Sequence, residues 1–261
     1  MIRHRHRRCY SARVKDLNVL VGGLICNYRH EGAGPAVLLI HGWAQSAATW
    51  NAVIPELAKT YSVYAIDLPG FGESQTPAQP WNVDEYAGFV GAFTAALNIK
   101  PYAVLGHSFG ARVAALYAAQ HSPPRLVLYG MGSGRRSFFR LLNILLMHTV
   151  GRIAPRLLYA AHRSLLTPAG YTDDSELTSA RARMMLRIYA NTHGTESPPS
   201  LRCPTLLIYG KRDPITPYWI GSRLSGVIPG SKLVTLPQEG HLAHIRNPQI
   251  FLQHILTFLR D

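Results

Sequence analysis

Short apolar segments alternate along this chain with longer stretches that have helical spacing. Most of these apolar segments end at a glycine or a charged residue, which is the pattern of strands buried on both faces of a sheet. The segments are "PAVLLIHG", "YSVYAIDLPGFGES", "PYAVLGHS", "RLVLYGMGSG", "PTLLIYGKRD" and "SKLVTLPQEGH". The helical stretches cover residues 48–60, 83–98, 109–120 and 248–259. This alternation predicts an α/β fold, with a mostly parallel sheet and helices on both of its faces.

Two regions depart from the alternation. Residues 19–21 and 24–29 flank Gly22 and Gly23, which predicts a β-hairpin ahead of the first buried strand. From about residue 131 to residue 200 there is no strong strand pattern, and arginines punctuate the apolar residues at roughly helical spacing. We therefore expect a helical cap inserted between two core strands.

The chain accordingly divides into four predicted parts. Residues 1–15 form a basic N-terminal arm, 16–130 the first part of the core, 131–200 the cap, and 201–261 the second part of the core. No apolar region follows the arm, so it does not have the pattern of a secretory signal. The arm is either disordered or lies upstream of the true start codon, and the sequence leaves both readings open.

Composition limits the classes of partner and compartment. The net charge of +13 favours an acidic partner, but there is no zinc-finger spacing and no P-loop, so a nucleic-acid partner is not expected. The 3 cysteines are too few and too scattered for a disulfide framework or a zinc site, which predicts a reducing, cytoplasmic location and no metal. No apolar stretch is long enough to predict a membrane span.

Ser108 lies between two glycines in "LGHSFGARVA". The pattern Gly-x-Ser-x-Gly occurs by chance in many chains and therefore depends on its context. Here a predicted strand precedes the serine and a predicted helix follows it. Such a strand-to-helix turn exposes the hydroxyl, and the free N–H groups of the helix start can stabilise an oxyanion. Ser108 is therefore a candidate nucleophile.

A nucleophilic serine requires a base and a carboxylate that orients the base. Asp213 and His241 each follow a predicted strand, so both should lie at the same edge of the sheet as Ser108. His244 is a nearby alternative to His241. His107 is not expected to be the base, because the side chain of a residue adjacent to Ser108 must point away from it.

The oxyanion also needs donors from the backbone. The loop "HGWAQSAATW" after a predicted strand places the N–H of Trp43 as one donor, and the N–H of Phe109 as the other. His41 and Gly42 are expected to shape that loop. We expect Asp67 to stabilise its own loop and Glu239 to be a solvated loop charge.

The segments "LLIHGW", "DLPGFGES", "GHSFG", "GKRDPITP" and "EGHLAHIRNPQIF" resemble the α/β-hydrolase superfamily in order and spacing, from about residue 23 to the C-terminus. The resemblance implies a hydrolase without metal or cofactor, in which Ser108 is the nucleophile, Asp213 the acid and His241 the base. A serine at this turn argues against the haloalkane dehalogenase and epoxide hydrolase branches, whose nucleophile is a carboxylate. The fold alone does not determine the substrate.

The chain is also partly similar to the esterases that remove a methyl group from pimeloyl-acyl-carrier protein, which have a basic cap that docks the acidic carrier. Between residues 131 and 200 there are nine arginines against four acidic residues. Arg135, Arg136 and Arg140 are the candidate partner-binding residues. The alternative is an ordinary solvated helix face.

The leading hypothesis is thus a serine carboxylesterase that acts through an acyl-enzyme on a small free ester or on an ester bound to an acidic carrier protein. A carbon–carbon bond hydrolase with the same three residues is an alternative. Apolar residues beside arginines, Phe138, Phe139 and 141–147, suggest a lipase with weak contact to a membrane surface. A non-catalytic binding protein of the same fold is the remaining alternative.

Overall fold

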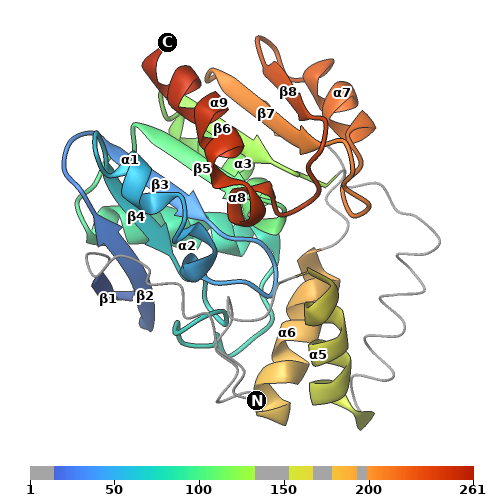
Figure 1. Ribbon diagram of the computed structural model, residues 1–261. Coiled ribbons are helices and arrows are strands. Elements are labelled where there is room, and N and C mark those ends of the chain that lie inside the picture. Colours follow the sequence, from blue (N-terminus) through green and yellow to red (C-terminus); the bar gives the residue numbers. More distant parts are fainter. Residues whose placement is uncertain (1–14, 133–152, 167–177, 193–198) are drawn as a thin grey trace, which may run out of the picture.

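The computed structural model describes residues 15–132, 153–166, 178–192 and 199–261. Its centre is an eight-stranded sheet with the strand order β1-β2-β4-β3-β5-β6-β7-β8 (Figure 1). The strands are β1 (Lys15–Val21), β2 (Leu24–Glu31), β3 (Ala36–Ile40), β4 (Ser62–Ile66), β5 (Ala103–His107), β6 (Arg125–Tyr129), β7 (Thr205–Gly210) and β8 (Lys232–Leu236). Pairing is antiparallel between β1 and β2 and between β2 and β4, and parallel elsewhere. The predicted mostly parallel sheet is confirmed.

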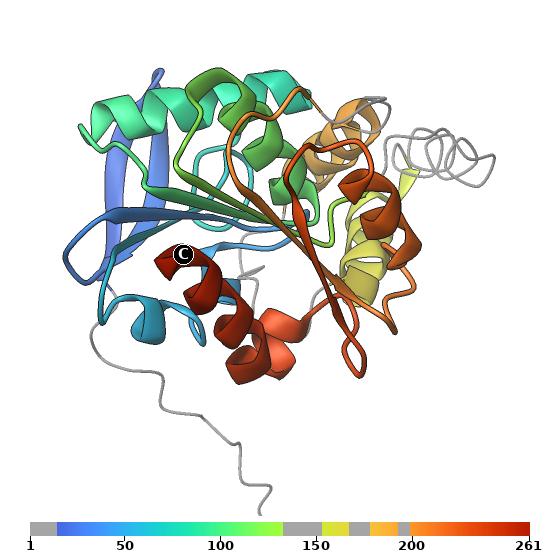
Figure 2. The same ribbon diagram turned by 90° about the horizontal axis from the view of Figure 1, so that it is seen from above.

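The helices cover both faces of the sheet, as predicted. Figure 2 shows α2 and α3 on one face, and α1, α8 and α9 on the other. The helical elements are η1 (Ala47–Trp50), α1 (Ile54–Leu57), α2 (Val83–Ala96), α3 (Phe109–His121), α5 (Pro155–Leu166), α6 (Ser179–Thr192), α7 (Trp219–Ser225), α8 (Ala243–Arg246) and α9 (Pro248–Arg260). In the described part of the chain, no helix is both long enough and apolar enough to cross a bilayer.

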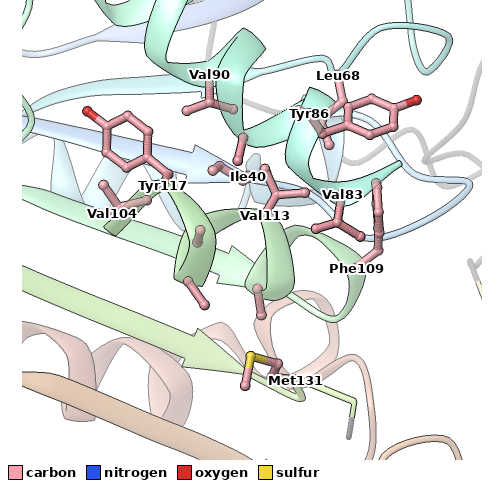
Figure 3. Close-up of a cluster of buried hydrophobic side chains, with 14 of the residues drawn as sticks. Ile40, Leu68, Val83, Tyr86, Val90, Val104, Phe109, Val113, Tyr117 and Met131 are labelled. Atoms are coloured by element: carbon pink, nitrogen blue, oxygen red, sulfur yellow. The ribbon is translucent and has the colours of Figure 1, made fainter. Parts of the chain in front are cut away.

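Alternate residues of each buried strand enter two different cores. In β3, Val37 and Leu39 pack in the core beneath α1 and α9, whereas Leu38 and Ile40 pack in the core beneath α2 and α3. Figure 3 shows Ile40 on the side of the sheet that faces Val113 of α3. Full burial of one such side chain contributes about 1.5–3 kcal/mol to stability. The continuous apolar character of these strands follows from burial on both faces.

The predicted N-terminal hairpin is present, with strands longer than expected. Val21 pairs with Leu24, and the turn between them consists of Gly22 and Gly23. Both glycines have positive φ, 56° and 81°, a conformation that side chains disfavour. This two-residue turn therefore explains the glycine pair.

The prediction of one helix over residues 48–60 is wrong. The chain forms the short element η1, a turn, and then α1, which has Pro55 in its first turn. Proline has no N–H to continue a helix, and its ring clashes with the carbonyl four residues earlier. A new helix can begin at proline, but a continuous one cannot pass through it.

The helices α5 and α6 lie between β6 and β7 in the chain and pack together outside the sheet (Figure 1). Among their described residues there is no strand, in keeping with a helical insertion. Arg181 of α6 donates to the carbonyl of Gly72 at 2.5 Å and approaches that of Gly70 at 3.5 Å. Asn191 donates to the carbonyl of Pro80 at 3.1 Å. These contacts fasten α6 to the long loop after β4, while the exact limits of the cap stay a prediction.

Candidate active site

Ser108 occupies a strained turn between β5 and α3. Its φ of 52° and ψ of −111° lie outside the regions that residues with side chains prefer. Its N–H donates to the carbonyl of Tyr129 at 2.8 Å. A Cβ on Gly106 would lie 2.3 Å from the carbonyl oxygen of Gly110, and one on Gly110 would lie 2.3 Å from that of His41. Only glycine therefore fits on either side of this serine, because the backbones approach so closely.

Asp213 and His241 form a buried pair. Asp213 follows β7 and His241 follows β8, and the carboxylate Oδ2 lies 2.7 Å from the ring Nδ1. The hydroxyl of Thr216 donates to the same Oδ2 at 2.6 Å. The N–H groups of Ile215 and Thr216 donate to Oδ1 at 2.7 and 2.9 Å. Every oxygen of this carboxylate therefore has donors, and the pair is held in a fixed orientation.

These contacts also determine the charge of the carboxylate. Burial by itself raises the pKa of Asp213, but the hydrogen bond and the charge of His241, together with the bonds from Thr216, outweigh it. The net result is a pKa below the ordinary value for aspartate. Asp213 is therefore ionised at neutral pH and can stabilise a positive charge on His241.

The serine and the histidine are each in contact with the end of β6. Ser108 is bonded to the carbonyl of Tyr129, the last residue of β6. The next residue is Gly130, where an added Cβ would lie 3.3 Å from the ring of His241 and 3.1 Å from the hydroxyl of Thr216. Ser108 and His241 thus both lie against the same strand end, at the carboxyl edge where ligands of such sheets sit.

The two predicted oxyanion donors come from adjacent segments. Phe109 is the first residue of α3, so its N–H has no acceptor within the helix. Trp43 lies in the loop after β3. A Cβ on Gly110 would lie 2.3 and 2.4 Å from the carbonyl oxygens of His41 and Ile40, so the start of α3 packs directly against the end of β3. The two backbone segments are therefore neighbours, as the oxyanion prediction requires.

His244, the alternative to His241, is fully buried in an aromatic environment. Its ring centroid lies 4.9 Å from that of Trp50 and 4.5 Å from that of His107. Neither of its ring nitrogens has a hydrogen-bond partner, and burial lowers its pKa to about 3. The histidine that is bonded to Asp213 is His241.

His107 does not serve Ser108 as a base, because both of its ring nitrogens contact other groups. Nδ1 lies 3.1 Å from Oε1 of Gln45, and Nε2 lies 2.9 Å from the carbonyl oxygen of His241. The ring is fully buried.

His41 and Asp67 organise loops at this edge of the sheet, as predicted. Nε2 of His41 accepts from the N–H of Leu68 at 3.1 Å. The carboxylate of Asp67 accepts from the N–H groups of Ala47 at 2.6 Å and Glu73 at 2.9 Å. Burial nevertheless raises the pKa of Asp67 to about 6.

Two further predictions have different outcomes. Glu239 was expected to be solvated, but it is half-buried and accepts from Nδ2 of Asn247 at 3.1 Å. The candidate partner-binding residues Arg135, Arg136 and Arg140 lie outside the described residues.

Three side chains in the site were not singled out from the sequence: Thr216, Gln45 and Tyr129. The hydroxyl of Tyr129 donates to the carbonyl of Gly240 at 2.9 Å and accepts from the N–H of Ala243 at 2.7 Å, so it holds both sides of the loop that carries His241. Only Thr216 had a usable signal. It follows Asp213 by three residues, and an aspartate side chain at a turn or helix start commonly accepts from N–H groups two or three residues further on.

Comparison with known proteins agrees with this geometry. A family model described as alpha/beta hydrolase family matches residues 37–253. A pimeloyl-[acyl-carrier protein] methyl ester esterase of Aeromonas hydrophila is 28% identical over 265 residues, covering 87% of this chain and 96% of that protein. The 2-hydroxy-6-oxo-6-(2'-aminophenyl)hexa-2,4-dienoic acid hydrolase of Metapseudomonas resinovorans is 28% identical over 263 residues, covering 92% and 89%.

A solved structure shows the same fold at lower identity. The enol-lactonase of Burkholderia xenovorans LB400 superposes with a TM-score of 0.77 at 21% identity, covering 94% of this chain and 100% of that one. The matched family region includes Ser108, Asp213 and His241, together with strands β4 to β8 and nearly all of β3. The chain belongs to the alpha/beta hydrolase family and is a hydrolase of that class.

Proposed function

We propose that this protein is a serine carboxylesterase, in which Ser108 is the nucleophile, His241 the general base and Asp213 the residue that orients the base. Backbone N–H groups of Trp43 and Phe109 would stabilise the oxyanion. The observation that carries the proposal is the buried 2.7 Å bond between Asp213 and His241, at the strand end that also holds Ser108 in its strained turn.

The reaction follows from this arrangement. With Nδ1 of His241 donating to Asp213, the other ring nitrogen, Nε2, carries a lone pair and can accept the proton of the Ser108 hydroxyl. The serine oxygen then bonds to the ester carbonyl, and the carbonyl oxygen becomes an oxyanion. The protonated imidazole returns its proton to the leaving alcohol, which leaves an acyl-enzyme. Water then attacks the acyl carbonyl while His241 takes its proton. The bond to the Ser108 oxygen breaks, His241 returns the proton to that oxygen, and the carboxylic acid is released.

Aromatic side chains of the cap favour an apolar acyl group. The indole ring of Trp43 lies 5.6 Å from the ring of Tyr159 in α5 and 5.0 Å from that of Tyr189 in α6, both edge-to-face. Met131, Tyr159 and Leu186 belong to the same buried cluster as Trp43. An ester with an apolar acyl chain would be expected to pack against such groups.

The leaving group defines two versions of the ester proposal, a small free ester and an ester bound to an acidic carrier protein. The similarity to the Aeromonas esterase supports the second version. The exposed arginines Arg156, Arg183 and Arg187 on α5 and α6 add positive charge, whereas Arg181 is engaged with the loop after β4. A cytoplasmic location is part of this proposal, whereas weak contact with a membrane surface would accompany the alternative of a membrane-surface lipase.

Carbon–carbon bond hydrolysis is a second candidate function. The Metapseudomonas enzyme is as similar to this chain as the esterase is, at 28% identity for each. Both reactions can use the same three residues, so the substrate decides between them.

The test is labelling with a fluorophosphonate, followed by a panel of p-nitrophenyl esters of increasing chain length and a 2-hydroxy-6-oxo-dienoate. We expect labelling of the wild type, none of Ser108→Ala, and turnover of the esters. Turnover of the dienoate alone would favour the carbon–carbon hydrolase. Wild-type protein that neither reacts with the phosphonate nor turns over any substrate would favour a binding protein.

A further inference from the structure

His107 connects two loops of the site that are far apart in the sequence. Its ring is fully buried and stacks on Tyr129, with ring centroids 4.9 Å apart. Its Nδ1 faces Oε1 of Gln45 in the loop that carries Trp43, and its Nε2 faces the carbonyl oxygen of His241. The residue before the proposed nucleophile therefore contacts both the oxyanion loop and the loop of the base.

The orientation of the Gln45 amide is determined by a backbone donor. The N–H of Gly42 donates to Oε1 of Gln45 at 2.9 Å. If the amide were flipped, an NH₂ group would face this N–H, so the oxygen must be where the structure places it. A Cβ on Gly42 would lie 2.8 Å from that oxygen and 2.9 Å from Nδ1 of His107, so the three groups are tightly packed. Both nitrogens of His107 thus face oxygen acceptors.

A neutral imidazole has one N–H and can donate to only one of these oxygens. Burial holds the pKa of His107 well below its usual range, and the nearby His244, His241 and His41 lower it further. His107 is therefore neutral at neutral pH. Oε1 of Gln45 already has a donor in Gly42, and the contact to the carbonyl of His241 is the shorter one, 2.9 Å against 3.1 Å. These facts favour the tautomer with the proton on Nε2.

We propose that His107 is a positioning residue of the hydrolytic reaction, whose Nε2–H holds the backbone carbonyl of His241 and thereby keeps the imidazole of His241 between Asp213 and Ser108. This inference rests on the proposed function. A displacement of about 1 Å in a reacting group can lower the rate about a hundredfold, so an anchor on the main chain of the base affects turnover without touching the substrate.

Two amide substitutions separate this bond from simple packing. In His107→Gln the side-chain NH₂ reaches the position of Nε2 and can donate to the carbonyl of His241. In His107→Asn the NH₂ reaches only the position of Nδ1, so that carbonyl loses its donor. We expect kcat for a p-nitrophenyl ester to fall 10- to 100-fold in His107→Asn, with KM changed less than threefold, and to recover to at least a third of wild type in His107→Gln.

Proton NMR supplies a readout that does not depend on a substrate. The Nδ1–H of His241, bonded to Asp213, should give a low-field resonance that is lost in His241→Ala. We expect this resonance to be retained in His107→Gln and shifted or broadened in His107→Asn. Melting temperatures of the two variants should agree within a few degrees, since both replace the ring with a neutral amide.

A measurement on the wild type covers the case in which neither variant folds. In protein with ¹⁵N-labelled histidine, the ring nitrogens of His107, assigned through contacts to the ring of Tyr129, report the tautomer directly. We expect the proton on Nε2. A proton on Nδ1 alone would overturn the proposal, because Nε2 could then not donate to His241.

The outcomes separate this proposal from the proposed function. Equal losses of kcat in His107→Gln and His107→Asn, or no loss in either, would overturn the positioning role. If Ser108→Ala kept its activity, the proposed function would fail, whatever the His107 variants did. Loss of activity in Ser108→Ala, with the expected split between the two His107 variants, supports both.

Discussion

Gly130 offers a direct test of how closely the base is held at the end of β6. Gly130→Ala would place a methyl group 3.3 Å from the ring of His241 and 3.1 Å from the hydroxyl of Thr216. These distances are a few tenths of an ångström shorter than ordinary contacts, so the ring must move by about that amount. Since a 1 Å misplacement can lower the rate about a hundredfold, we expect kcat to fall about 3- to 10-fold.

The same substitution also strains the backbone, because Gly130 has a φ of 58°. An L-residue at such a φ costs about 1–2 kcal/mol. For a chain of this size that corresponds to a fall in Tm of about 2–8 °C. Gly230 is the matched control, since its φ is 66° and an added Cβ would meet nothing within 4 Å. Gly230→Ala should therefore lose similar stability and keep full activity.

Steady-state turnover of a p-nitrophenyl ester and thermal unfolding are measured on both variants. Together they separate displacement of His241 from general destabilisation. The reasoning is supported if the two variants lose similar stability and only Gly130→Ala loses kcat. Full activity in Gly130→Ala would show that His241 does not act from its position against Gly130. Equal losses of kcat in both variants would assign the effect to general destabilisation.

Three further predictions concern the nucleophile, a buried histidine and the cap. Ser108→Ala should lose fluorophosphonate labelling, and its kcat should fall on the order of 10⁴- to 10⁶-fold while its circular dichroism spectrum stays unchanged. Activity above a tenth of wild type would contradict the assignment of Ser108 as the nucleophile. Burial lowers the pKa of His244 to about 3, so below about pH 6.5 the unfolded chain binds a proton there and the folded chain does not, which lowers the free energy of unfolding. In urea unfolding, the difference in this free energy between His244→Leu and wild type should be about 2 kcal/mol more favourable to the variant at pH 5 than at pH 8. Identical pH dependence in both proteins would refute this. Replacing Arg135, Arg136 and Arg140 together with glutamate should lower the rate of hydrolysis of a carrier-bound ester at least tenfold, because an acidic carrier is attracted by the summed positive charge. The rate of hydrolysis of a short free ester should change little. Equal loss on both substrates would assign these arginines to the structure of the cap.

The pairing of Asp213 with His241 could be predicted because each residue is marked by a local pattern, the strand directly before it. Each residue directly follows a short apolar strand, and strand ends in a parallel sheet meet at one edge. The same reasoning chose His241 over His244, which the structure buries among aromatic rings. Periodicity and strand ends were therefore sufficient for the sheet and for the contact between Asp213 and His241.

What the sequence did not predict depends on contacts across the fold. Gln45 and His107 are 62 positions apart, and no periodic pattern connects them. Tyr129 was assigned only to a strand, yet its hydroxyl at the strand end holds the loop that carries the base. The break near Pro55 was missed because apolar spacing on both sides of it fits one helix. Such features follow from three-dimensional packing rather than from spacing along the chain.

The proposed machinery is divided between two stretches of the chain on either side of α5 and α6. Ser108, Phe109 and Trp43 precede them, whereas Asp213 and His241 follow them, and the two stretches meet where β6 pairs with β7. Polypeptides separated within the cap would each carry half of the reacting groups and be inert alone. Ester turnover in a mixture of the two would then report their reassociation, which makes this architecture a natural scaffold for fragment complementation.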